Sequence, residues 1–201
     1  RDGARVMLRS ISPRDRRRLA ASFERLSEES RYRRFFTAKE KLSAAELDYF
    51  VDVDHGDHEA IIAIDPSGGD LLGVARYVRS NHEVDVAEVA VTVADDWQKR
   101  GLGRALLDRL TYRARRQGIR KFSALVQTDN LASLGLLETV GDNQRRLDGG
   151  LVEIVIELPP SRGIGARLAQ ALRAAAAGTL VPAHTRTHRL GVGTLEREEL
   201  K

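Results

Sequence analysis

The stretch Gln98-Lys99-Arg100-Gly101-Leu102-Gly103-Arg104-Ala105 decides the fold of this 201-residue chain. A run rich in β-branched residues, 84–94, precedes it, and a leucine-rich face with four-residue spacing follows from Leu102 to Ala114. The first pattern predicts a strand and the second a helix. The first backbone N–H groups of a helix are unpaired and attract anions, and glycines at alternate positions leave no Cβ to block a phosphate. The sequence therefore predicts a diphosphate site at this junction.

The composition is that of a soluble globular protein, with 42% hydrophobic and 31% charged residues. The chain has no cysteine, which excludes disulfides, thiolate metal sites and cysteine nucleophiles. Its apolar runs are all shorter than the roughly 20 residues that span a bilayer, and we see no signal peptide. We expect a cytoplasmic protein without a membrane partner.

The formal net charge is +4 and the isoelectric point is near 9.7. A solvated arginine-rich surface, a basic collar around a polyanionic cofactor and nucleic-acid binding would each account for this charge. Because the arginines are spread along the chain and are not interleaved with exposed aromatic residues, we predict no nucleic-acid partner.

Hydrophobic patterns and turn signals predict an α+β domain over residues 1–160 and an Ala/Arg-rich C-terminal helix and tail over 161–201. Ser12-Pro13, Ser30 and Ser43 mark helix starts, the last with a Ser-Ala-Ala-Glu capping box. Strands are expected at 5–11, 59–65, 71–78, 84–94, 121–127, 144–147 and 151–158, and the later helices at 102–117, 131–140 and 163–177.

The spacing Gln-x-x-Gly-x-Gly from Gln98 to Gly103, between a strand and a helix, resembles the acetyl-CoA signature of the GNAT superfamily of N-acetyltransferases. The resemblance covers residues 4–158. The stretches 31–36 and 53–60 look more narrowly like the catalytic domain of bacterial protein lysine acetyltransferases, which act on acyl-CoA synthetases. This likeness implies the GNAT fold, a mixed, mostly antiparallel sheet of six to seven strands flanked by helices. The sheet would be splayed near its fourth and fifth strands, and a C-terminal helical appendage would follow.

The resemblance also implies acetyl-CoA as co-substrate. Backbone amides of 98–104 would wrap the pyrophosphate, and main-chain groups of the preceding strand would bond the pantetheine arm, which is itself peptide-like. Trp97 is expected to pack in the core or to stack on the cofactor. The predicted cofactor-binding residues are Val91, Val93, Gln98, Lys99, Arg100, Gly101, Leu102, Gly103, Arg104, Asn130 and Ser133.

Glu88 matches the position of the family's general base on the fourth strand. An ammonium has no lone pair with which to attack a thioester, so the reaction needs a base. Among Val86, Val89 and Ala90 we expect the Glu88 carboxylate to be partly desolvated, with a raised pKa. The other interpretation is an outward-facing strand residue paired with an arginine. Many members of the family carry a tyrosine general acid where this chain has Leu137, so no acid is assigned.

His55 and His58 lie among acidic residues, which is compatible with a metal cluster, a polar loop or the lining of an acceptor site. We predict no metal. By the likeness to lysine acetyltransferases, His55, His58, Tyr32 and Phe36 are expected to line the acceptor site, although the two aromatic residues could equally belong to the core.

The sequence therefore predicts an enzyme of the N-acyltransferase class, which moves an acetyl group from acetyl-CoA to an amine, preferably a protein lysine ε-amine. The alternatives are a small-molecule amine as acceptor and a sensor domain that binds acyl-CoA without turnover. The segment 163–177 would pack on the domain or on a second subunit, which leaves a homodimer open.

Overall fold

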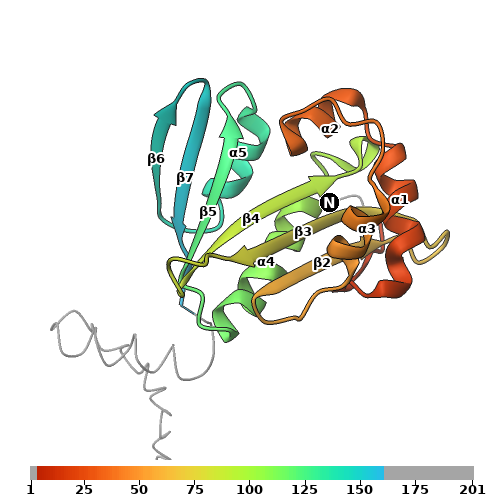
Figure 1. Ribbon diagram of the computed structural model, residues 1–201, viewed down its shortest axis with the longest axis horizontal. Helices are drawn as coiled ribbons and strands as arrows, with labels where there is room; N and C mark the ends of the chain where they lie inside the picture. The colour runs from red at the N-terminus through yellow and green to blue at the C-terminus, as the bar shows by residue number, and fades with distance from the viewer. Residues whose placement is uncertain (1–3, 161–201) are drawn as a thin grey trace, which may run out of the picture. The chain divides into compact units, whose positions relative to one another are not determined.

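The computed structural model describes residues 4–160, which form a seven-stranded sheet with helices on both faces (Figure 1). The segments 1–3 and 161–201 lie outside the described residues, and with them the predicted C-terminal helix and tail. In chain order the elements are β1 (Met7–Ser10), η1 (Pro13–Asp15), α1 (Arg16–Glu24), α2 (Glu28–Phe35), α3 (Ala44–Val51), β2 (His58–Ile64), β3 (Leu71–Arg79), β4 (Val86–Val93), η2 (Asp95–Trp97), α4 (Leu102–Arg116), β5 (Lys121–Gln127), α5 (Leu131–Glu138), β6 (Asn143–Asp148) and β7 (Leu151–Glu157).

The strand order is β1-β2-β3-β4-β5-β7-β6, and every neighbouring pair is antiparallel except β4 and β5. The parallel pair is short, because only Val86, Ala87 and Glu88 of β4 find partners on β5. Beyond Glu88 the two strands diverge, as Figure 1 shows. The predicted mixed, mostly antiparallel sheet is confirmed, and it opens between its fourth and fifth strands.

Strand β2 is buried along its whole length and joins two separate cores. Ile61 and Ala63 pack in the core that contains the buried face of α4. Ile62 and Ile64 pack on the opposite face, in the core that contains residues of α1 and α3. Side chains of a strand alternate between the two faces of its sheet, so an apolar residue is needed at every position of a strand covered on both sides.

The helix starts follow local capping signals, with one correction to the prediction. Ser43 and Glu46 form the expected capping box of α3. Helix α2 begins three residues earlier than expected, because its N-cap is Ser27, whose side chain accepts a hydrogen bond from the amide of Ser30. Ser30 therefore lies inside the helix, where its hydroxyl is available for a tertiary contact.

None of the helices within residues 4–160 is long and apolar enough to cross a lipid bilayer.

Candidate active site

The connection from β4 to α4 is a tight turn with two left-handed residues. Lys99 has φ of 58° and Gly101, the N-cap of α4, has φ of 91°. The first amide that bonds back into the helix is that of Ala105, which donates to the Gly101 carbonyl at 3.1 Å. The amides of Leu102, Gly103 and Arg104 come before it, so they carry the partial positive charge of a helix start. This geometry suits an anion.

The two glycines of this turn have different structural roles. A Cβ on Gly101 would meet no atom within 4 Å, so the position needs glycine for its backbone conformation and leaves the space beside it open. A Cβ on Gly103 would lie 2.8 Å from Leu136 Cδ2, which means that this glycine lets α4 pack closely against α5. Only Gly101 therefore fits the predicted role of leaving room for a phosphate.

The side chain of Gln98 stabilises the turn through hydrogen bonds to its preceding residues. Its Nε2 donates to Asp95 Oδ1 at 2.9 Å and to the Val93 carbonyl at 3.3 Å. Asp95 in turn accepts hydrogen bonds from the Ser27 amide at 2.7 Å and from Ser30 Oγ at 2.5 Å. These bonds tie the turn to the first residues of α2.

Two of the three basic side chains of the turn, those of Arg100 and Arg104, have contacts within the protein. The Arg100 guanidinium stacks 4.0 Å from the centre of the Trp97 ring, and Arg104 forms an ion pair with Asp108 one helical turn further on. Trp97 itself is half-buried and packs against the main core, which matches its predicted core role.

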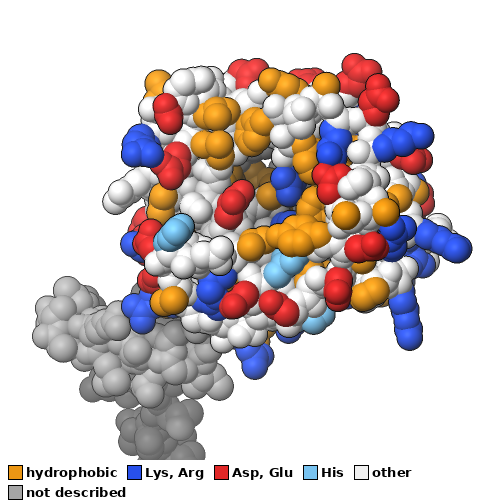
Figure 2. All heavy atoms as spheres, in the orientation of Figure 1, with side chains coloured by type: hydrophobic (Ala, Val, Ile, Leu, Met, Phe, Trp, Pro, Cys, Tyr) orange, Lys and Arg blue, Asp and Glu red, His pale blue; other side chains and the backbone are white. Residues whose placement is uncertain are grey.

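Beyond Glu88, one edge of β4 lacks a strand partner among the described residues. Val91 and Val93 lie opposite Ala75 and Gly73 of β3, and their side chains pack against the α4 core. On the side toward β5, alternate main-chain N–H and C=O groups are therefore available to a ligand. Figure 2 shows this face of the molecule hollowed over the region where β4 and β5 separate.

Glu88 lies where the two strands part, opposite Val78 of β3 and Ser123 of β5. Its side chain is exposed, which contradicts the predicted desolvation: Val89 points to the buried α4 face of the sheet, while Glu88 points to the opposite face, which it shares with Val86 and Ala90. The alternative of an arginine ion pair is also not found among the described residues, although the Glu88 carboxylate raises the pKa of Arg34 against the stronger lowering effect of burial.

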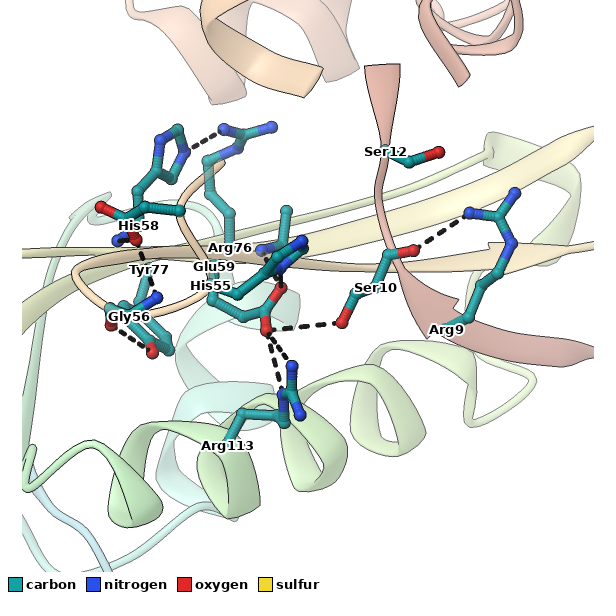
Figure 3. A network of polar contacts seen from close by, with 12 residues as sticks. Arg9, Ser10, Ser12, His55, Gly56, His58, Glu59, Arg76, Tyr77 and Arg113 are labelled. Atoms are coloured by element: carbon teal, nitrogen blue, oxygen red, sulfur yellow. Dashed lines mark hydrogen bonds and ion pairs between the residues drawn. The ribbon is translucent and has the colours of Figure 1, made fainter. Parts of the chain in front are cut away.

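His58 and Arg76 share the sheet face of Glu88. His58 lies opposite Val78, and Arg76 lies opposite Ala90, and residues in register point to the same face. Arg76 donates to His58 Nε2 at 2.6 Å (Figure 3), and burial followed by the Arg76 charge lowers the pKa of His58. His58 is therefore a neutral, buried acceptor for this arginine.

His55 lies apart from this group. Its Nδ1 donates to Glu59 Oε1 at 3.0 Å, and Glu59 is fully buried on the α4 face, where Arg113 also bonds it at 2.9 Å (Figure 3). Because His58 and Glu59 are neighbours on a strand, their side chains point to opposite faces. The predicted grouping of the two histidines in one acceptor site is therefore not formed, and no cluster of three or more metal-binding side chains occurs within residues 4–160.

Tyr32 and Phe36 are both exposed on and just after α2, at 47% and 38%. This excludes the core interpretation and leaves both on the surface of a helix that contacts β4. Phe36 ends the helix in a left-handed conformation with φ of 54°.

Asn130 and Ser133 contact each other at the start of α5. Asn130 is buried, and its side-chain oxygen accepts the Ser133 amide at 3.1 Å as the N-cap of the helix. The side-chain oxygen of Asn130 therefore has a structural role. Leu137, which stands where many family members have a tyrosine, is 3% exposed and belongs to the core. This position therefore supplies no proton donor.

Sequence reasoning missed two arginines, Arg76 on the sheet face of Glu88 and Arg34, whose pKa the Glu88 charge raises. The two side chains line a cavity of about 40 Å³ whose walls are largely apolar. One signal was available for Arg76, because a lone cation interrupts the apolar run 71–78. No comparable signal marked Arg34, one of four arginines between 25 and 34.

Comparison with known proteins agrees with this architecture. The sequence profile of the acetyltransferase (GNAT) family matches residues 20–141. The acetyltransferase Pat of Mycolicibacterium smegmatis is 36% identical over 160 residues, which are 80% of this chain and 48% of that protein, so the chain spans about half the length of this relative. The acetyltransferase PA5475 of Pseudomonas aeruginosa is 34% identical over 142 residues, 70% of this chain and 76% of that protein.

Among solved structures, the GNAT domain of S. lividans PAT superposes with a TM-score of 0.73 at 33% identity, over 79% of this chain and 93% of that one. A profile match over more than half of the chain, two relatives above 30% identity and a shared fold all agree. This chain belongs to the acetyltransferase (GNAT) family.

Proposed function

We propose that this protein transfers the acetyl group of acetyl-CoA to the ε-amine of a lysine in a protein, with Glu88 as general base. The observation that carries the proposal is the continuous path from the amides that open α4, along the unpaired edge of β4, to the Glu88 carboxylate. Val93 lies five positions after Glu88, so this edge is roughly 17 Å long. It is long enough for an extended arm that starts at the anion site.

Each part of the path suits one part of acetyl-CoA. The main-chain amides of 102–104 bind the pyrophosphate, and the Gly101 position gives it access. The free edge of β4 near Val91 and Val93 pairs with the amide groups of the pantetheine arm, as an added strand would. The thioester then lies beside Glu88.

Glu88 removes the proton that the attacking amine must lose. Because its carboxylate is exposed, it takes this proton directly or through one water molecule. A main-chain N–H of β4 donates to the oxygen on which negative charge develops. Leu137 is buried, so the departing thiolate takes its proton from solvent, which its modest basicity allows.

The choice of a protein lysine rests on the likeness of residues 31–36 and 53–60 to protein lysine acetyltransferases. A small amine is the second candidate acceptor. Both require turnover, which separates them from a domain that only binds acyl-CoA.

The test is a screen of lysine-containing proteins and small amines with acetyl-CoA, read by thiol release and by mass spectrometry of the acceptor. We expect a gain of one acetyl group on a lysine side chain. Tight binding of acetyl-CoA without turnover on any amine would instead support the sensor. An absence of calorimetric heat with coenzyme A would refute the whole assignment.

A further inference from the structure

A cavity over the sheet face that carries Glu88 is lined by two arginine side chains from different elements. Arg34 of α2 and Arg76 of β3 both line it, between the aromatic rings of Phe35 and Phe50. Its volume of about 40 Å³ has room for a few groups the size of water, each of which needs roughly 10–15 Å³. The cavity is therefore large enough for one small polar group and too small for an acceptor as a whole.

Neither arginine forms an ion pair with any residue in 4–160. Arg76 is held by uncharged acceptors, His58 Nε2 at 2.6 Å and the Phe50 carbonyl at 2.9 Å, and it stacks 4.5 Å from the Phe50 ring centre. The Arg34 guanidinium lies 5.0 Å from the centre of the Phe35 ring. Both cations thus rest on aromatic faces without an ion pair in the described part of the chain, and the Glu88 charge only partly offsets the lowering effect of burial on the pKa of Arg34.

The two charges also act on each other. Burial, followed by the charge of Arg34, lowers the pKa of Arg76 to about 10. Removing a cation from water without a counter-charge is unfavourable, and two neighbouring cations add to the effect. An anion that entered the cavity would offset both the cost of burying the two cations and their mutual repulsion. Guanidinium groups bind the planar carboxylate group in bidentate fashion, so a carboxylate suits this place.

The position of the pair relative to Glu88 makes it relevant to the acceptor. Arg76 lies opposite Ala90, two residues along β4 from Glu88 and on the same face, so the rows are roughly 7 Å apart. The pyrophosphate turn lies at the other end of α2, where Ser27 bonds Asp95, about 10 Å along the helix from Arg34. Arg76 therefore places one side of the cavity two residues from the base, and Thr92 places the other side four residues from it, toward the phosphate turn.

We propose that Arg34 and Arg76 form an anion subsite that binds a carboxylate of the acceptor, next to the amine that is acetylated. The inference deepens the proposed function and rests on it for the reaction. The carboxylate could belong to an aspartate or glutamate beside the acceptor lysine or to the α-carboxylate of a free amino acid. In both sources the subsite selects acidic acceptors and directs their amine to Glu88.

The test compares terminally blocked peptides that contain aspartate–lysine or asparagine–lysine, and free lysine with lysine amide, as acceptors for acetyl-CoA. We expect the carboxylate-bearing member of one pair to have a kcat/KM about tenfold to a hundredfold higher, the range for a charged hydrogen bond. Which pair responds identifies the source. Arg34→Met should reduce the ratio to about one and Arg34→Lys should keep part of it. Arg33→Met is the matched control, because Arg33 forms a surface ion pair with Glu29, and it should leave the ratio unchanged.

A second measurement separates this inference from the proposed function. Calorimetry of a blocked aspartate–norleucine peptide, which has no amine, against the coenzyme A complex reports carboxylate binding without turnover. Binding heat in the parent protein that is lost in Arg34→Met supports the subsite, even if no peptide is acetylated. In that case only the proposed function fails. If the two members of each pair have equal kcat/KM and the norleucine peptide gives no heat, the subsite is overturned. Turnover of the peptides would still support the proposed function. An Arg34-dependent preference for succinyl-CoA over acetyl-CoA, without any acceptor preference, would also overturn it, because the anion would then belong to the acyl group.

Discussion

Glu88 lies opposite Ser123 at the last register position that joins β4 to β5. Up to this row the two strands form an ordinary parallel pair, and beyond it each presents a separate edge. The carboxylate is therefore at the point where the gap in the sheet closes. An extended ligand that enters the gap from the α4 end stops beside it, so position along the sheet gives Glu88 its proposed role.

Replacing Glu88 by glutamine should separate catalysis from binding. We expect kcat to fall about 10²- to 10⁴-fold, the usual contribution of a general base, with unchanged affinity for coenzyme A. Steady-state thiol release and calorimetry measure the two quantities. Glu83→Gln, at an exposed turn before β4, is the control and should behave as the parent protein. An equal loss of coenzyme A affinity and kcat in Glu88→Gln would show that the residue serves binding instead.

Gly101 offers a test in which shape and charge are separated. Asparagine and aspartate both tolerate the left-handed backbone of this position better than other residues, and they differ in charge. We expect Gly101→Asp to bind coenzyme A about tenfold to a hundredfold more weakly than Gly101→Asn, because its carboxylate repels the pyrophosphate. Gly118 has φ of 82° and open space at the opposite end of α4, so the same pair of substitutions there should not change the affinity. Equal affinities for the two Gly101 variants would argue against an anion at this turn.

Gly103 should matter through packing. A methyl group there would meet Leu136 Cδ2 at 2.8 Å, so Gly103→Ala should lower the free energy of unfolding by about 1–3 kcal/mol. Shortening the opposing side chain removes the clash, so Gly103→Ala combined with Leu136→Ala should be more stable than the sum of the single effects predicts. Urea unfolding of the four proteins measures this coupling. Strict additivity would mean that α4 and α5 do not meet at this point.

His58 should make stability depend on pH in a defined direction. Burial, then the Arg76 charge, lowers the pKa of His58 below its ordinary 6.5. In the window just below 6.5 the unfolded chain binds the proton and the folded protein does not, so stability falls as the pH drops. Hydrogen bonds lower the pKa values of the Glu46 and Asp54 carboxyls, so these groups act in a more acidic range.

The measurement is urea unfolding at about pH 7.5 and about pH 5.5. His58→Gln keeps an acceptor for Arg76 and removes the titration, so its loss of stability on acidification should be smaller than that of the parent protein. His82→Gln, at an exposed turn, serves as control. An unchanged difference between the two pH values in His58→Gln would assign the effect to other groups.

The sequence predicted those elements whose signals are local. The strand at 121–127 has the observed bounds, and the capping box at Ser43 begins α3 as expected, because neither depends on distant residues. The prediction that α2 starts after Ser30 was wrong, since Ser27 is an equally good N-cap and the bond of Ser30 to Asp95 is a tertiary contact. Local chemistry alone could not decide between them.

The candidate site was predictable in its backbone part and less so in its side chains. The turn around Gly101 could be recognised because the glycine spacing and the flanking periodicities occur together in one short stretch. The exposure of Glu88 could not be recognised from the sequence, because it depends on where β5, more than thirty residues later, stops pairing with β4. The cavity between Arg34 and Arg76 brings together elements forty residues apart. Strand alternation predicts that His58 and Glu59 point to opposite faces, but the bond that takes His55 to the Glu59 side comes from a residue before the strand.

The unpaired edge of β4 has an evolutionary consequence. Hydrogen-bonding groups of the main chain are the same whichever amino acid occupies a position, and only proline removes the N–H. Val91 and Val93 can therefore be exchanged for other apolar residues that fill the α4 core without altering what the edge offers a ligand. Relatives that diverge widely in sequence along this strand can keep one mode of recognition, because its specificity is carried by chain direction and not by side-chain identity.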